Sequence, residues 1–241
     1  MTKRSPFSGG FTGTVGIVSS DEGMVRMVSD AIDGAFEKDG HFLHQIEESR
    51  YEKEGDRFRV VLAAVEEELC FKLAPLTGVP FDEAFWRQAG TADLIVYVLA
   101  LPLEPAFDFG ESSAMLDTVL TELKALKRPY MVLLTHIQRL LPADPVSSDR
   151  QWWAVLDRLY HFFETGSTSV DEVLNSLCRE AAWHFRKSLS AIPGKIGFLY
   201  TDGADRILYG LDECMADLLV QMLGTISGGE FSIHASRGQL S

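Results

Sequence analysis

The sequence has few cysteines, no long apolar run and no cluster of basic residues. Its three cysteines lie far apart in 241 residues and form no CxxC pair, which favours reduced, buried thiols over a disulfide framework. No apolar run reaches the roughly 18 residues of a membrane span, and the N-terminal residues lack the apolar core of a signal peptide. The net charge of −13 disfavours binding to nucleic acids or anionic membranes. We therefore expect a cytoplasmic protein without nucleic-acid partners or stable membrane insertion.

The composition is that of a globular α/β protein. Hydrophobic residues make up 46% of the chain, enough for one α/β domain with a full core or for two small ones. Residues 1–12 and 225–241 are rich in serine, glycine and polar residues, and we expect flexible termini there. Residues 13–224 are expected to form a single domain.

Apolar runs and amphipathic stretches alternate along this domain and predict the order β-α-β-β-α-β-α-β-α-α-β-α. The expected strands are Thr14–Val18, Phe58–Val65, Leu69–Leu73, Asp93–Leu99, Tyr130–Leu134 and Ile196–Tyr200. The expected helices are Glu22–Glu37, Phe81–Ala89, Gly110–Leu126, Asp149–Glu164, Val170–Leu189 and Ile207–Met222. The charged stretch Asp39–Asp56 is interpreted as a solvent-facing connection, and Ala74–Pro80 as a loop.

This order predicts a three-layer α/β fold with a mostly parallel sheet. Strand–helix alternation is typical of a parallel sheet covered by helices. Only Glu66–Glu68 separate the second and third strands, and so short a link permits an antiparallel hairpin but no helical crossover. We therefore expect one antiparallel edge strand.

The segment Thr14–Phe36 has the layout of a phosphate-binding strand, loop and helix but lacks the residues that bind phosphate. A P-loop, G-x-x-x-x-G-K-[ST], needs glycine for the tight turn, lysine for the phosphates and a hydroxyl for magnesium. Here Gly23 is followed by Met24 and Val25. The loop also carries Asp21 and Glu22, which would repel phosphate.

Three further segments resemble parts of the Ras-like and Era-like (TRAFAC) P-loop GTPases. ADLIVYVLALP, at Ala92–Pro102, resembles the strand that follows the second switch of those proteins. RPYMVLLTHIQRL, at Arg128–Leu140, resembles their guanine-specificity strand. Lys195–Leu223 resembles the last strand, loop and helix of the family. The resemblance implies a small-GTPase-like sheet, and the segment Asp149–Leu189 would be an extra helical insertion.

The family's nucleotide-binding motifs are degenerate at every expected place. The switch-two D-x-x-G falls on Pro75-Leu76-Thr77-Gly78, without the aspartate. The specificity motif [NT]-K-x-D reads Thr135-His136-Ile137-Gln138, and glutamine cannot replace the charged acceptor of the guanine edge. The loop of the last strand reads Thr201-Asp202-Gly203. The degenerate positions are Gly23, Met24, Val25, Pro75, Gly78, Thr135, His136, Gln138, Thr201 and Asp202.

These losses predict a non-catalytic GTPase-like protein, a pseudo-GTPase, with no cofactor and no metal site. Phosphoryl transfer depends on positioning and on charge neutralisation by lysine and magnesium. We expect an interaction or regulatory module, and the resemblance implies that its partner is another GTPase-fold protein or a second copy. The aromatic candidates for partner binding are Phe81, Phe85, Trp86, Trp152 and Trp153.

Two alternatives remain open at this stage. One is an enzyme or ligand binder that uses the carboxyl ends of the strands, with Asp21, Glu22, Thr135, His136 and Asp202 as its candidate residues. The other is a degenerate receiver-like domain, because GIVSSDEGMVRMV resembles the acidic loop of that family. Val98 stands where a receiver domain has its phospho-accepting aspartate.

Overall fold

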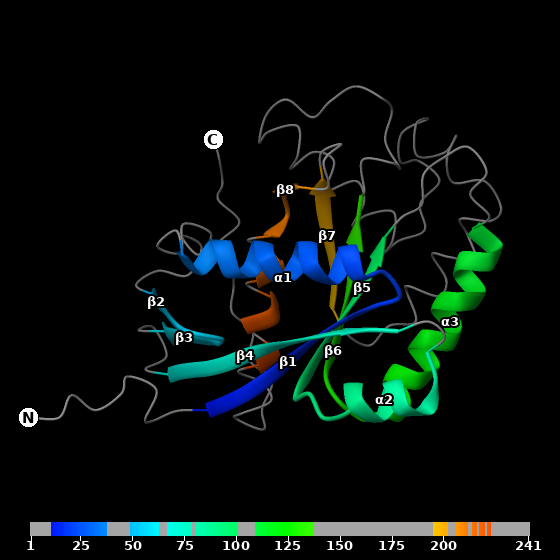
Figure 1. The fold of residues 1–241 in the computed structure, drawn as a ribbon, viewed down its shortest axis with the longest axis horizontal. Helices are drawn as coiled ribbons and strands as arrows, with labels where there is room; N and C mark the ends of the chain where they lie inside the picture. Colours follow the sequence, from blue (N-terminus) through cyan, green and yellow to red (C-terminus); the bar gives the residue numbers. More distant parts are fainter. Residues whose placement is uncertain are drawn as a thin grey trace, which may run out of the picture.

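The computed structural model describes residues 11–37, 49–62, 67–78, 81–100, 109–136, 195–201, 206–211, 214–215, 217–219 and 221–222. The strands are β1 (Phe11–Ser19), β2 (Ser49–Glu54), β3 (Arg57–Leu62), β4 (Glu67–Thr77), β5 (Leu94–Ala100), β6 (Tyr130–Thr135), β7 (Lys195–Thr201) and β8 (Ile207–Tyr209). The helices are α1 (Glu22–Glu37), α2 (Glu83–Ala89) and α3 (Phe109–Ala125), and helical residues continue between 211 and 222 (Figure 1).

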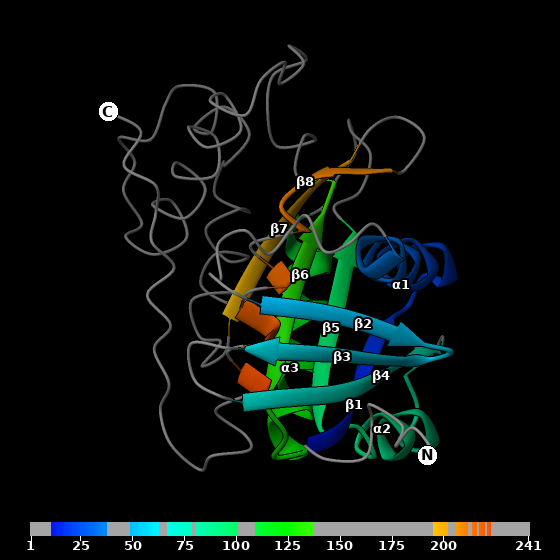
Figure 2. The same ribbon diagram turned by 90° about the vertical axis from the view of Figure 1, so that its left-hand side faces the viewer.

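The described strands form one 8-stranded sheet in the order β2-β3-β4-β1-β5-β6-β7-β8. Strands β4, β1, β5, β6 and β7 run parallel to one another. At one edge β2, β3 and β4 lie side by side and antiparallel (Figure 2), and β8 is antiparallel to β7 at the other. The predicted mostly parallel α/β sheet with an antiparallel edge is therefore confirmed.

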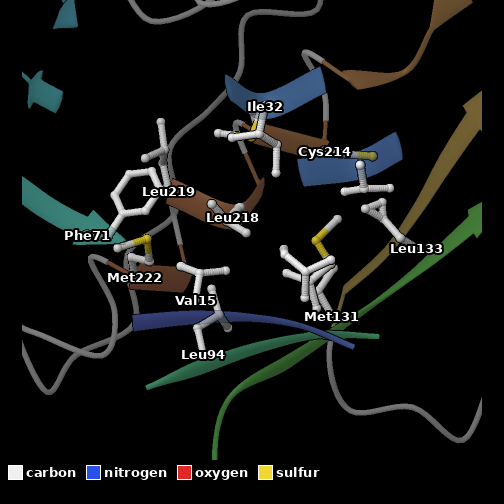
Figure 3. Packing of buried hydrophobic residues seen from close by; sticks show 14 of the residues in the cluster. Val15, Ile32, Phe71, Leu94, Met131, Leu133, Cys214, Leu218, Leu219 and Met222 are labelled. Carbon is white, nitrogen blue, oxygen red and sulfur yellow. The ribbon is translucent and has the colours of Figure 1, made fainter. Parts of the chain in front are cut away.

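Two hydrophobic clusters lie on opposite faces of the sheet and make the fold three-layered. Alternate residues of β1 point to opposite faces, so Val15 and Ile17 face α1 while Val18 faces α2 and α3. Figure 3 shows residues of the last helix packed with Val15, Leu94 and Met131 of the sheet. Strands β5 and β6 are buried on both faces, as expected of central strands with continuous apolar sequences.

The charged connection predicted for residues 39–56 is wrong for Ser49–Glu54, which form β2. The sequence of this strand has no apolar alternation. It is held by its register with β3 and by ion pairs from Glu52 to Arg59 and from Lys53 to Asp33. Long-range pairing therefore overrides the weak local preference.

The predicted loop Ala74–Pro80 is also wrong at its start, because β4 continues to Thr77. Pro75 lies opposite Ile17 of β1. The pairing of β3 with β4 ends at Lys72, so β1 is the paired neighbour of β4 at Pro75 among the described strands. Proline is tolerated there because its missing N–H can face the unpaired side.

The last predicted helix begins later than expected. Ile207–Tyr209 form β8, and Gly210, with φ 94°, turns the chain into the helix, a conformation that glycine adopts without strain. The predicted bounds of α1 are confirmed. The predicted helices at 149–164 and 170–189 lie outside the described residues.

Two of the three cysteines can be placed. Cys70 and Cys214 are buried free thiols, as the sequence predicts, and Cys178 lies outside the described residues. No described helix combines the length and apolar character needed to cross a membrane.

Candidate functional site

The carboxylate of Asp21 caps the N-terminus of α1. Its Oδ1 accepts hydrogen bonds from the backbone N–H of Gly23 at 2.7 Å and of Met24 at 3.4 Å. The backbone N–H of Asp21 donates to Oγ of Ser19 at 3.2 Å. Free N–H groups at a helix N-terminus favour anions. In this chain the anion is already supplied by the protein.

The first turn of α1 is covered by apolar side chains where a P-loop has lysine and a hydroxyl. Met24 is 7% exposed and Val25 is 2% exposed, and both belong to the α1-side core. Sδ of Met24 accepts a hydrogen bond from Oγ1 of Thr135 at 3.5 Å. A lysine ammonium in this apolar position would lose its hydration without gaining a partner. The two degenerate P-loop positions are therefore core residues.

Buried polar residues gather at the carboxyl ends of the parallel strands. Within the described segments, these residues are Ser19 of β1, Thr135 and His136 at the end of β6, and Thr201 of β7. Ligands of open α/β sheets bind beyond this edge. The side chains are at most 2% exposed, so they offer no open binding surface in this conformation.

Thr135 and His136 contact each other. Oγ1 of Thr135 lies 2.9 Å from Nδ1 of His136. His136 has φ 60°, a left-handed conformation that is uncommon outside glycine. His136 is 2% exposed, so its imidazole lies inside the protein.

The switch-two equivalent has no carboxylate that could bind magnesium. Pro75 is an exposed residue of β4, and Gly78 lies against the ring of Phe85. Among the described residues no group of three or more His, Cys, Asp or Glu side chains is placed to hold a metal ion. Gln138 and Asp202 lie outside the described residues.

The aromatic candidates after β4 are mostly core residues. Phe85 is 8% exposed and Trp86 is 6% exposed, and Phe81 is partly buried against the same cluster. Phe85 and Trp86 therefore present no accessible ring to a partner in this conformation, and their role in partner binding stays a prediction. Trp152 and Trp153 lie outside the described residues.

Among the alternative catalytic candidates that the structure describes, two are exposed and two are buried, so these four do not line one open pocket. Asp21 and Glu22 are exposed, whereas Thr135 and His136 are buried. Glu22 pairs with Arg26 at 2.7 Å on the surface of α1. Val98, the position that a receiver domain would need as aspartate, is a buried core residue of β5.

One charged cluster was missed by the sequence analysis. Arg59 of β3 binds Glu68 of β4 through two hydrogen bonds, of 2.7 and 2.9 Å, and Glu52 of β2 through a third of 2.7 Å. The two hydrogen bonds from Arg59 to Glu68 lower the pKa of Glu68. Opposite charges on neighbouring strands could have indicated this cluster. The contribution of Glu52 could be recognised only if residues 49–54 were predicted as the strand β2.

Comparisons with known proteins identify no family. No family model matches the sequence, and no curated protein matches it. One solved structure, the 5'-methylthioadenosine/S-adenosyl homocysteine nucleosidase of Campylobacter jejuni, has 8% identity and a TM-score of 0.15, covering 74% of this chain and 94% of that one. A futalosine hydrolase mutant of Helicobacter pylori strain 26695 has 10% identity and a TM-score of 0.15, with the same coverages. Similarity at this level supports no conclusion about fold or function.

Proposed function

We propose that this chain is a pseudo-GTPase, a GTPase-like protein that binds no GTP–magnesium and acts as a protein-interaction or regulatory module in the cytoplasm. The observation that carries the proposal is the carboxylate of Asp21 on the N-terminal N–H groups of α1. A nucleotide phosphate at that place would have to displace this carboxylate and tolerate its negative charge.

Three features of the scaffold support the GTPase-like part of the proposal. Strand β1 lies inside the parallel sheet and leads through a short polar loop into α1. An antiparallel hairpin lies at one edge of the sheet. The segments that resemble the second-switch strand and the specificity strand form β5 and β6, which are neighbours. Each feature is expected from the sequence resemblance.

The absence of catalysis is supported by the chemistry of the replaced positions. Met24 is packed in the core and contacts Thr135. Pro75 has no carboxylate for a magnesium-bound water. Without a lysine and a metal, the charge that develops on a transferred phosphoryl group would not be neutralised.

A titration with fluorescent GTP and GDP, with and without magnesium, tests this proposal. We expect no saturable binding up to high micromolar protein. An Asp21→Asn variant keeps the capping acceptor and removes the charge, and it should also fail to bind because Met24 remains. Saturable binding that unlabelled GTP reverses would disprove the proposal, particularly if Gly23→Ala abolished it.

The partner in this proposal is a protein, either a second copy of the chain or another GTPase-fold protein. Sedimentation of the full chain over a wide concentration range distinguishes these two. Reversible formation of a dimer would support the second copy. A monomer at every concentration would reject self-association and leave a different protein as the partner.

A further inference from the structure

The end of β4 is packed directly against α2. A Cβ atom added to Gly78 would lie 2.7 Å from Cδ2 and 3.2 Å from Cε2 of Phe85. Phe85 is 8% exposed, so its ring has little room to move away. The backbone after β4 can therefore approach the ring only because residue 78 is glycine.

Phe81 joins this contact to the sheet. Its ring centroid lies 4.7 Å from that of Phe85, 5.4 Å from that of Trp86 and 6.3 Å from that of Tyr97 in β5. Asp82 follows, and its Oδ1 accepts the backbone N–H of Phe85 at 2.8 Å, which starts α2 immediately after Phe81. We call Gly78, Phe81 and Phe85 the aromatic latch.

Tyr97, whose ring lies beside that of Phe81 in the same cluster, has an unpaired hydroxyl. Tyr97 is fully buried, and its hydroxyl has no hydrogen-bond partner among the described residues. Burial raises the pKa of Tyr97 to about 12. A buried hydroxyl without a partner destabilises the closed state, because it has given up its hydrogen bonds to water.

The aromatic contacts stabilise the docked helix, and the unpaired hydroxyl opposes them. We propose that α2 undocks locally as a unit when Phe81 leaves the latch. Water then reaches the hydroxyl of Tyr97, and the rings of Phe81, Phe85 and Trp86 become accessible. This inference does not depend on the proposed function, because it rests on the packing of α2 against the sheet, although Gly78 is also the last residue of the predicted switch-two equivalent.

Hydrogen exchange of the full chain, read separately for α1 and α2, tests the inference. In the unmodified protein the amides of α2 should exchange faster than those of β5 and β6, at a rate that low denaturant leaves unchanged. Tyr97→Phe removes the unpaired hydroxyl from the closed state and should slow exchange in α2 about tenfold. Unchanged exchange in α2, or equal slowing in α1 and α2, would show that α2 opens only by global unfolding and would overturn the proposal.

A second variant tests the contact between residue 78 and Phe85. Gly78→Ala places a methyl group against the Phe85 ring and should accelerate exchange in α2 while leaving α1 unchanged. Gly34→Ala in α1 controls for the added methyl group, since a Cβ there meets no atom within 4 Å, and it should leave exchange in α2 unchanged. If Gly78→Ala accelerated α1 and α2 equally, or left α2 unchanged, the latch would not control α2.

Discussion

The hydroxyl of Thr135, at the end of β6, donates a hydrogen bond to Sδ of Met24 in the first turn of α1 over 3.5 Å. The two residues are 111 positions apart in the sequence. This contact packs the beginning of α1 against the carboxyl end of β6, where the predicted resemblance to GTPases would place a nucleotide. Met24 and Val25, the residues at the predicted P-loop lysine position, are thus packed parts of the core.

Truncation of Met24 should destabilise the protein strongly. Met24→Ala removes a buried side chain from the α1-side core, and such substitutions cost about 2–5 kcal/mol. Met27→Ala, on the same helix but only partly buried, should cost clearly less. Urea unfolding of both variants measures the difference. Equal losses would show that Met24 is not packed as the structure describes.

Asp21 should stabilise α1 through its capping hydrogen bonds. Asp21→Ala is expected to lower the free energy of unfolding by about 1 kcal/mol. Asp21→Asn should lower it much less, because asparagine also accepts from the N–H groups of the first turn. Chemical denaturation distinguishes the two. If Asp21→Asn lowered the free energy of unfolding as much as Asp21→Ala, the charge of Asp21 would contribute more than its hydrogen bonds.

Glu68 should make the free energy of unfolding depend on pH. Hydrogen bonds from Arg59 hold the pKa of Glu68 below its ordinary value in the folded state. A lowered folded pKa stabilises the protein above the unfolded pKa, and this contribution disappears as pH falls through the folded pKa.

Glu68→Gln is therefore expected to unfold more easily than the unmodified protein at neutral pH, and the difference should vanish in acid. Glu83→Gln is the control, because the pair of Glu83 with Arg87 is exposed on α2 and such pairs contribute little. Denaturation at several pH values provides the measurement. A difference for Glu68→Gln that persisted in acid would point to lost packing instead of lost charge.

Gly197 should be required for close packing of the last helix on β7. A Cβ atom at this position would lie 2.6 Å from both Sγ of Cys214 and Cε of Met131, two residues that Figure 3 shows in the same cluster. Gly197→Ala should cost about 1–3 kcal/mol by overpacking.

A second substitution tests this explanation. Cys214→Ala removes one of the two obstructing atoms. Cys214→Ala should therefore lower the free energy of unfolding less in the Gly197→Ala background than in the unmodified protein. Thermal unfolding of the two single variants and the double variant measures the interaction energy between the two substitutions. Strict additivity would contradict a steric conflict between residues 197 and 214.

The sequence by itself determined the elements that have strong local signals. Helix α1 was predicted with its observed bounds because its apolar residues recur at helical spacing after a short polar loop. The central strands β5 and β6 were predicted because their apolar runs suit burial on both faces. The resemblance to GTPase nucleotide motifs without their lysine, hydroxyl and aspartates also comes from the sequence alone, and it stays a prediction.

Tertiary structure decided the features whose partners lie far away in the chain. The charged residues of β2 become a strand because β3, Arg59 and Asp33 pair with them. The burial of Phe85 and Trp86 follows from the docking of α2 on the sheet. The contact of Met24 with Thr135 joins two segments that no local pattern relates. Periodicity shows which residues can be buried, but only the assembled fold shows what buries them.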